Sequence, residues 1–291
     1  MIGIDLGGTK VLAGVVDREG RVEQRRERPT PLGSQDALLV GLDEAVEELL
    51  RDDVVALGFG IPSQIDQRTG EVEASVNIPL AGLDFRARMA ERFALPVGIE
   101  NDANAATLAE FVAGAGRDVR DMVMLTLGTG CGGGAVIDGK LYRGWAEFGH
   151  MVIEFDGLPC QGTCHGRGHL EPYVTGTAAT KLAQEAFGPA VDAHRLVRLA
   201  AEGEARAIEI LAEMGRHLGA GIASLVNIFN PELVVIGGGF AAAGDFLLGS
   251  AREVLRRDAL SHAGEKVSIA RAKLGTAAGL IGAGLIGFES L

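Results

Sequence analysis

Aromatic residues and cysteines are scarce in this chain of 291 residues. Aromatic side chains make up 5% of it and there are three cysteines, against 43 glycines. This balance indicates many tight turns and close backbone approaches rather than aromatic stacking. A low, odd cysteine count fits a reducing cytoplasm better than a disulfide framework. The first residues show no signal-peptide pattern, and no apolar run is long enough to span a bilayer. We therefore expect a cytoplasmic protein with no membrane partner.

Basic side chains are also in deficit. The chain has 27 Lys and Arg against 39 Asp and Glu, a net charge of −12, which argues against a nucleic-acid partner. An anionic ligand would have to be bound by backbone N–H groups and a metal instead of a basic patch. No Gly-x-x-x-x-Gly-Lys-Ser/Thr segment is present, so the usual P-loop is excluded. The length and the ordinary share of apolar residues predict a globular α/β chain with two lobes.

Residues 2–20 and 122–139 share one plan, in which a strand, a glycine turn, a second strand and a second turn follow one another. Two such hairpins can grip a phosphate chain, because glycines let backbone N–H groups approach phosphate oxygens and a threonine adds a hydroxyl donor. A carboxylate at the end of the first strand can hold Mg²⁺ through water. The hairpin residues assigned to the phosphates and their cation are Asp5, Gly7, Gly8, Thr9, Lys10, Gly128, Thr129 and Gly130.

Two other glycine patterns resemble a dinucleotide fingerprint. The pattern at 128–133 runs into a strand, although the fingerprint requires a helix there, so the match is accidental. Gly237-Gly238-Gly239 follows a strand and precedes a helix, but it comes very late in the chain for a nicotinamide site. We assign these three glycines to the adenosine side of a nucleotide site.

Hydrophobic periodicity predicts the remaining elements. Helices are expected over 36–51, 85–93, 103–111, 206–228, 246–255 and 276–288, and strands over 54–61, 95–99 and 233–236. The expected lobes are 1–112 and 113–275, with 276–291 as a closing helix that returns to the first lobe.

The metal ligands of this chain are concentrated between residues 147 and 171. His150, Cys160, Cys164 and His169 have the residue types and spacing of a four-coordinate zinc site with no position left for water, so the metal would be structural. It would fix a loop that presents Glu147, His150 and Glu171. The alternatives are a Cys160–Cys164 disulfide or a polar loop without a metal.

Glu100-Asn-Asp-Ala-Asn-Ala-Ala106 is the expected reactive centre. It lies between a strand end and the start of a helix, where Asp102 can accept a proton from a hydroxyl and Asn101 can donate to or accept from neighbouring hydroxyls. The alternative is that Asn101 or Asp102 simply caps the helix.

Five ordered motifs resemble the ROK family of sugar kinases and sugar-responsive repressors. They are Asp5-Leu-Gly-Gly-Thr-Lys10, Glu100 to Ala106, Leu127-Gly-Thr-Gly130, Glu147-Phe-Gly-His150 and the Cys/His loop that ends in His169-Leu-Glu171. The resemblance implies a two-lobed actin-like ATPase (ribonuclease H-like) fold that binds a hexose and ATP in the interlobe cleft. It gives Asp102 the role of general base, and it assigns Asn77, Asn101, Glu147, His150 and Glu171 to the sugar hydroxyls.

The zinc loop departs from the family pattern. A cysteine is usual where His169 stands and the first cysteine is displaced, so the site would be Cys₂His₂, with His165 as a rival ligand. The resemblance implies that His150 uses one ring nitrogen for zinc and the other for the sugar.

The expected activity is ATP-dependent formation of glucose 6-phosphate. Kinases for N-acetylmannosamine, N-acetylglucosamine or fructose and a polyphosphate donor stay open as alternatives. A repressor is disfavoured because Asp5 leaves no room for a preceding DNA-binding segment. Surplus apolar positions over 208–225, together with the resemblance, predict a homo-oligomer, a dimer or a tetramer.

Overall fold

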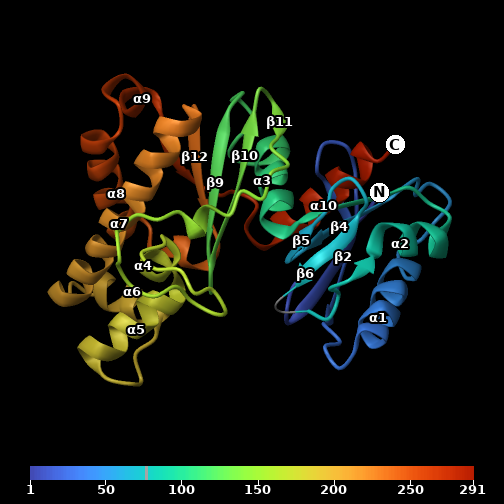
Figure 1. Ribbon diagram of the computed structural model, residues 1–291, viewed down its shortest axis with the longest axis horizontal. Helices are drawn as coiled ribbons and strands as arrows, with labels where there is room; N and C mark the ends of the chain where they lie inside the picture. The colour runs from blue at the N-terminus through green and yellow to red at the C-terminus, as the bar shows by residue number, and fades with distance from the viewer. Residues whose placement is uncertain (76–77) are drawn as a thin grey trace. The chain divides into compact units, whose positions relative to one another are not determined.

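The computed structural model describes residues 1–75 and 78–291 and divides the chain into two compact units (Figure 1). Unit 1 comprises Met1–Arg117, Arg143–Trp145 and Lys273–Leu291, and unit 2 comprises Asp118–Tyr142 and Ala146–Ala272. The lobe boundaries predicted after residues 112 and 275 remain predictions.

The main sheet of unit 1 has the strand order β3-β2-β1-β4-β8. β1, β2 and β3 are antiparallel neighbours, whereas β4 runs parallel to β1 and β8 runs parallel to β4. A small sheet, β5-β6-β7, follows β4 in the chain. The bounds in unit 1 are β1 Ile2–Leu6, β2 Lys10–Val16, β3 Val22–Pro29, α1 Gln35–Glu47, β4 Leu57–Ile61, β5 Ser63–Ile65, β6 Glu71–Ser75, β7 Leu83–Asp84, α2 Phe85–Phe93, β8 Val97–Asn101, α3 Asp102–Ala113, η3 Gly275–Ala277 and α10 Ala278–Glu289.

The sheet of unit 2 has the order β11-β10-β9-β12-β13. β9, β10 and β11 are antiparallel neighbours, and β12 runs parallel to both β9 and β13. The bounds in unit 2 are β9 Met122–Leu127, β10 Cys131–Ile137, β11 Lys140–Leu141, η1 Phe148–His150, α4 Glu171–Val174, α5 Gly176–Phe187, α6 Ala193–Ala201, α7 Ala205–Phe229, β12 Leu233–Gly237, η2 Gly239–Ala243, α8 Asp245–Asp258, α9 Ser261–Lys266 and β13 Ser268–Arg271.

The two main sheets therefore have the same plan, in which three antiparallel strands are continued by two parallel ones. The internal similarity in the sequence predicted their first hairpins, and the structure confirms both of them. Leu6 pairs with Val11 across the first glycine turn, and Leu127 pairs with Cys131 across the second.

Glycine allows α10 to lie directly against the sheet of unit 1. A Cβ on Gly58 of β4 would lie 1.8 Å from the carbonyl oxygen of Ala283, and a Cβ on Gly3 of β1 would lie 2.5 Å from the amide nitrogen of Gly284. Backbone packs against backbone at both positions, and no side chain larger than hydrogen fits. This contact accounts for part of the high glycine content and fixes α10 against β1 and β4.

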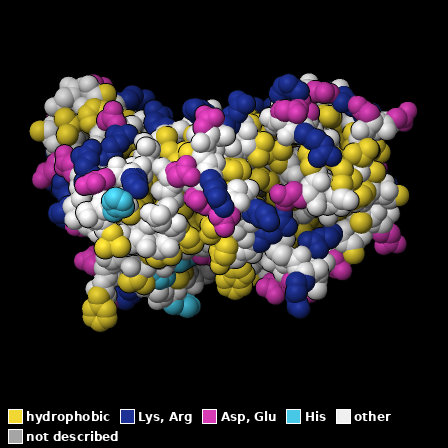
Figure 2. Space-filling view, turned by 90° about the horizontal axis from the view of Figure 1, so that it is seen from above, with side chains coloured by type: hydrophobic (Ala, Val, Ile, Leu, Met, Phe, Trp, Pro, Cys, Tyr) yellow, Lys and Arg dark blue, Asp and Glu magenta, His cyan; other side chains and the backbone are white. Residues whose placement is uncertain are grey.

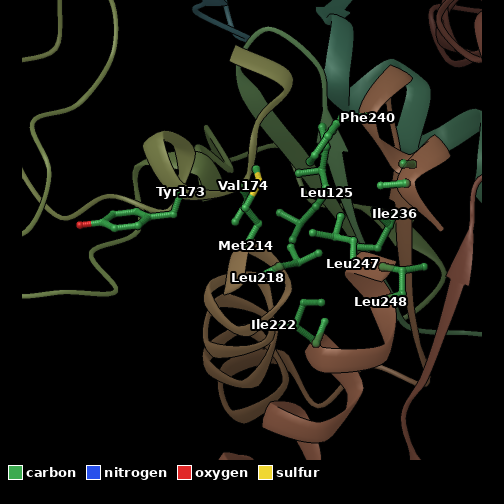
Figure 3. Close-up of a cluster of buried hydrophobic side chains, with 14 of the residues drawn as sticks. Leu125, Tyr173, Val174, Met214, Leu218, Ile222, Ile236, Phe240, Leu247 and Leu248 are labelled. Atoms are coloured by element: carbon green, nitrogen blue, oxygen red, sulfur yellow. The ribbon is translucent and has the colours of Figure 1, made fainter. Parts of the chain in front are cut away.

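Each unit has its own hydrophobic core. In unit 2 the buried face of α7 packs with α8 against the sheet, and Figure 3 shows Met214, Leu218 and Ile222 of α7 grouped with Leu247 and Leu248 of α8. Among the large apolar side chains of residues 208–225, Ile208 is the exposed one, at 37%. The surplus apolar positions of α7 thus belong to the core, and they do not support the predicted subunit contact.

Most of the predicted elements lie within a few residues of the observed ones. The observed strand β4 is shorter than the strand predicted at 54–61. It begins at Leu57, because Val54 forms a turn with Arg51. None of the helices in the described ranges is both long and apolar enough to cross a membrane.

Candidate active site

Polar side chains of unit 1 gather where parallel strands end. Asp5 of β1 is in register with Gly60 of β4, and Gly60 is in register with Glu100 of β8. The carboxyl ends of parallel strands meet at one edge of a sheet, which is where α/β proteins bind ligands. Asp5, Asn101 and Asp102 are therefore brought to the same edge.

Asn101 is the N-cap of α3. Its Oδ1 accepts hydrogen bonds from the backbone N of Ala103 at 2.9 Å and of Asn104 at 3.3 Å. The capping alternative is therefore correct for Asn101. The amide Nδ2, which lies 3.5 Å from the carbonyl oxygen of Ser63, is the group that remains suited to a ligand hydroxyl.

Asp102 is the first residue of α3 and is half-buried. Its Oδ1 accepts a hydrogen bond from the backbone N of Ala103 at 2.9 Å, which orients the carboxylate. Burial raises the pKa of Asp102 above its ordinary value, because desolvation disfavours the charged form. A raised pKa makes this carboxylate a stronger base than an exposed aspartate.

The pKa of Asp5 depends on its burial and on the nearby carboxylate of Asp102. Burial, and then the charge of Asp102, raise the pKa of Asp5 to about 7, whereas Lys10 acts in the opposite direction. The carboxylate packs against the first turn of α10, where a Cβ on Gly279 would lie 2.3 Å from its Oδ2. A buried carboxylate whose charge is disfavoured by a neighbouring carboxylate suits a hard cation, which favours the ionised form.

The first hairpin turn is closed by Gly7, whose backbone N donates to the carbonyl oxygen of Lys10 at 2.9 Å. Thr30, which directly follows β3, donates its hydroxyl to the carbonyl oxygen of Gly7 at 2.6 Å and so supports the turn. Thr9 is exposed at the tip next to Gly8. The Nζ of Lys10 forms an ion pair with Glu27 at 3.3 Å.

The second hairpin turn, at Gly128, Thr129 and Gly130, lies beside the start of α5. Gly176 donates its backbone N to the carbonyl oxygen of Gly128 at 2.9 Å, and Thr177 donates its hydroxyl to the carbonyl oxygen of Thr129 at 2.8 Å. Thr129 is exposed, as Thr9 is in the first hairpin. The two threonines thus have equivalent places in the two units.

A pocket of about 850 Å³ in unit 2 opens between this hairpin, α5, α6 and η2. It includes three of the predicted nucleotide-site residues, Gly128, Thr129 and Gly239. Gly237 ends β12 and Gly238 shapes the turn, with φ +82° and a Cβ position only 2.2 Å from the carbonyl oxygen of Leu127. The polar lining residues that the sequence did not reveal are Thr177, Thr180, Lys181, Gln184, Asp192, His194 and Arg198.

His150, Cys160, Cys164 and His169 form one cluster, in which one ligand atom from each residue lies within 4.8 Å of all the others. The Nδ1 atoms of the two histidines are 3.2 Å apart. Cys160 Sγ lies 3.6 Å from Nδ1 of His150, and Cys164 Sγ lies 3.7 Å from Nδ1 of His169. All three cysteines of the chain are free thiols, so the disulfide alternative is wrong.

These distances fit a tetrahedral zinc ion. With Zn–S near ~2.3 Å and Zn–N near ~2.0 Å, tetrahedral angles place sulfur and nitrogen ligands about 3.5 Å apart and two nitrogen ligands about 3.3 Å apart. Desolvation, and then Cys164, raise the pKa of the Cys160 thiol to about 11, so a thiolate there needs a cation beside it. His165, the rival ligand, lies outside the cluster.

The loop that carries the cluster is folded back on itself. Val152 forms a bridge with His169 and Pro159 forms one with Arg167. Gly168 has φ +66°, and a Cβ there would lie 1.6 Å from the carbonyl oxygen of Glu154, so only glycine fits just before His169. Tyr173 donates its hydroxyl to Glu154 at 2.6 Å; in Figure 3 its ring points away from the other labelled core side chains.

Glu171 connects the zinc loop with the second hairpin. Its Oε2 accepts from the backbone N of Cys131 at 2.8 Å, and its Oε1 lies 4.0 Å from Cys160 Sγ. Burial, followed by the charges of Glu171 and Glu147, raises the pKa of Cys131 to about 12. Glu147 is the N-cap of the short helix η1, its carbonyl oxygen accepts from the backbone N of His150 at 3.0 Å, and Nδ1 of His150 faces the cluster. Unit 2 therefore brings Glu147, His150 and Glu171 together, whereas Asn77 lies outside the described residues.

Comparisons with known proteins agree with this arrangement. A model of the ROK family matches residues 1–288. The glucokinase of Streptomyces coelicolor is 34% identical over 97% of this chain and 95% of its own length. A ROK hexokinase of Thermus thermophilus superposes with a TM-score of 0.86, at 36% identity over 99% of this chain and 98% of that one. A ROK glucokinase of Streptomyces griseus, solved with glucose and AMPPNP, gives a TM-score of 0.83 at 33% identity, covering 99% of both chains. The predicted fold class is confirmed.

Proposed function

The chain belongs to the ROK family, and we propose that it is a glucokinase that transfers the γ-phosphoryl group of ATP to the 6-hydroxyl of glucose. The observation that carries this proposal is full-length similarity to glucokinases in a chain that retains the chemistry they need. Unit 1 supplies a half-buried carboxylate at a helix start, and unit 2 supplies a nucleotide-sized pocket at a glycine hairpin.

ATP would occupy the pocket of unit 2. The turns at Gly128 and Gly239 line the pocket together with Thr129, so backbone N–H groups and a hydroxyl are available to phosphate oxygens. Lys181 and Arg198 add positive charge to a protein that is strongly acidic overall. Figure 2 shows Lys and Arg interspersed with Asp and Glu on the face drawn there, in accord with a small anionic ligand instead of a nucleic acid.

Asp102 would act as the general base. It would accept the proton of the 6-hydroxyl as the hydroxyl oxygen attacks the γ-phosphorus and the bond to the β-phosphate oxygen breaks, which yields glucose 6-phosphate and ADP. Its hydrogen bond from Ala103 fixes the carboxylate, and its raised pKa favours proton transfer.

Two metals complete the proposed site. Asp5 would hold Mg²⁺ through water, and this cation would offset the charge of the phosphates. The backbone N–H groups of the first hairpin, Gly7 to Lys10, and the hydroxyl of Thr9 would bind phosphate oxygens. Zinc would be bound by His150, Cys160, Cys164 and His169, whose geometry fits it. Zinc would fix the ring of His150 through Nδ1 and leave Nε2 for a sugar hydroxyl.

The remaining sugar contacts are proposed for Asn101, Glu147 and Glu171, and for Asn77 from the family resemblance alone. Glu171 also holds the backbone N of Cys131, so one side chain would connect the sugar with the phosphate-binding hairpin. The cytoplasmic location and the homo-oligomer, a dimer or a tetramer, are further proposals, the second based now on the family resemblance.

A coupled assay of the purified enzyme tests the function. The panel pairs glucose, fructose, N-acetylglucosamine and N-acetylmannosamine with ATP or polyphosphate, because these are the open alternatives. We expect the highest kcat/KM for glucose with ATP. A higher value for another sugar or for polyphosphate would replace the proposed substrate, and no turnover with any pair would reject a kinase.

A further inference from the structure

A buried carboxylate next to the proposed base has no part in the reaction as written. Glu100 is 2% exposed and comes directly before Asn101 and Asp102. Its Oε1 accepts three hydrogen bonds, from the backbone N of Asn101 at 2.9 Å, from Nδ2 of Asn104 at 3.1 Å and from Nε2 of Gln67 at 3.1 Å. One oxygen thus fixes both the last residue of β8 and the first turn of α3.

The other oxygen of Glu100 is open. Within the described residues Oε2 has no hydrogen-bond partner, and neither has Oδ1 of Asn104. The nearest cation to Oε2 is Nε of Arg143, which lies 3.8 Å away, an ion-pair distance that is too long for a hydrogen bond. Burial raises the pKa of Glu100, and the hydrogen bonds from Asn104 and Asn101, followed by the charge of Arg143, oppose this shift. Among the described residues, Arg143 is the one cation within ion-pair distance of Glu100.

Arg143 also bonds to Glu289 near the end of α10. The segment Arg143–Trp145 belongs to unit 1, although the chain on both sides of it belongs to unit 2. Glu147, a proposed sugar ligand, follows this segment by two residues. The stretch of chain that leads to Glu147 is therefore anchored, through Arg143, to Glu100 beside Asn101 and Asp102.

We propose that Glu100 and Arg143 form a positioning pair for Asp102. Arg143 holds Oε2 of Glu100 through the ion pair, and Oε1 of Glu100 holds the turn at Asn101, so that the Asp102 carboxylate is aligned with the sugar hydroxyl. Stability alone does not explain the pair, because an uncharged pair of similar size would avoid the cost of desolvation. The inference rests on the proposed function, and neither residue needs to contact the substrate.

The test compares three variants. Glu100→Gln and Arg143→Met should each lower kcat by about 10-fold or more and leave the KM for glucose within about 3-fold, because misalignment of a base acts on the chemical step. Arg143→Met should also lower Tm, since it leaves a buried carboxylate without its cation. The double variant Glu100→Gln/Arg143→Met should regain Tm without regaining kcat.

The matched control is Glu289→Gln, which removes the other partner of Arg143 and leaves Glu100 and Arg143 together. We expect a kcat close to that of the unaltered enzyme, because exposed ion pairs contribute little. Arg143→Lys should restore part of the kcat that Arg143→Met loses. If kcat in the double variant returned together with Tm, the pair would be merely structural and the proposal would be overturned.

A second measurement does not depend on turnover. Hydrogen exchange at the amides of residues 101–104 in the ligand-free protein should be about 10-fold faster in Glu100→Gln and Arg143→Met than in Glu289→Gln, because the turn loses its anchor. Unchanged exchange would reject the positioning pair even if the enzyme phosphorylates glucose. Absence of hexose phosphorylation by the unaltered protein would instead reject the proposed function.

Discussion

The zinc cluster allows a prediction whose size follows from the structure. Cys164 Sγ lies 3.7 Å from Nδ1 of His169, at one corner of a ligand set that a tetrahedral ion fits. Replacing Cys164 by serine exchanges a thiolate for a weakly acidic hydroxyl, which zinc at neutral pH binds poorly. We expect the unaltered protein to contain one zinc per chain and Cys164→Ser to contain almost none.

Loss of the metal should be visible as lost stability. A metal present at about 100 times its dissociation constant stabilises the folded state by about 2.7 kcal/mol. Unit 2 has about 150 residues, for which ~1 kcal/mol shifts Tm by roughly 2–4 °C. Cys164→Ser should therefore lower Tm by about 5–10 °C. The KM for glucose should rise by about 10-fold or more, because Nδ1 of His150 loses the ion that fixes its ring.

The assay is metal analysis by mass spectrometry, followed by calorimetry and kinetics on the same samples. His165→Ala is the matched control, since His165 shares the loop and lies outside the cluster. It should keep the metal and the Tm. A zinc content that falls in His165→Ala and persists in Cys164→Ser would refute the ligand assignment.

Four further predictions concern the proposed base Asp102, the buried carboxylate of Asp5, the packing of α10 on Gly58 and the oligomeric state. Asp102→Asn should lower kcat by about 100-fold or more with glucose binding retained in calorimetry, because the amide cannot accept the proton; more than a tenth of the normal kcat would exclude Asp102 as base. Since the pKa of Asp5 is raised to about 7, its protonated form favours folding, and that contribution is lost as the pH rises from about 4 through about 7. The Tm of Asp5→Asn minus the Tm of the unaltered protein should consequently be larger at pH 8 than at pH 5 in the absence of Mg²⁺. A Tm difference that is constant with pH would contradict the raised pKa. Gly58→Ala should lower the free energy of unfolding in denaturant by about 1–3 kcal/mol or more, because the added Cβ would lie 1.8 Å from a carbonyl oxygen. Gly33→Ala is the control, since its Cβ would meet open space and the stability should hardly change. Light scattering should give a dimer or tetramer mass, and a mass near the 30.3 kDa of one chain would reject the oligomer.

Local signals in the sequence were enough for much of the fold. Glycine turns between β-favouring runs located both hairpins, because tight turns and close approach of backbone need glycine. Helical periodicity located α1, whose buried residues Leu38, Leu39, Leu42 and Val46 lie on one face, and the long helix α7. Periodicity also misled at α7, since surplus apolar positions look the same whether a second protomer or the core of unit 2 covers them.

The zinc ligands were only partly determined by the sequence. Spacing selected His150, Cys160, Cys164 and His169, but it left His165 as a rival to His169. The structure distinguishes them through the backbone. The bridge between Val152 and His169 and the positive φ of Gly168 direct His169 to the cluster, and pairing across a loop has no signature in a short motif.

The pocket lining and the Glu100 network were beyond sequence reasoning for a related reason. Lys181, His194 and Arg198 lie in α5 and the neighbouring α6. They follow the glycine turn that they face by about 50 or more residues, and the repeat that located the turn does not include them. Arg143 and Glu100 are similarly remote in sequence. Such contacts depend on how helices pack, which propensity and periodicity do not specify.

The common plan of the two sheets separates scaffold from specificity. Both units have three antiparallel strands followed by two parallel ones, and each first hairpin carries an exposed threonine. What differs is the insertion. Unit 1 adds the small β5-β6-β7 sheet after β4, whereas unit 2 adds the zinc loop and α4 to α6 after β11. Phosphate binding needs only backbone at a glycine turn, which a duplicated hairpin supplies twice. Sugar recognition needs particular side chains, and most of those proposed for it, Glu147, His150 and Glu171, lie in the insertion of unit 2. Exchanging the zinc loop, residues 147–171, between relatives while keeping α5 and α6, which line the nucleotide pocket, should therefore change the preferred sugar and leave the affinity for ATP nearly constant.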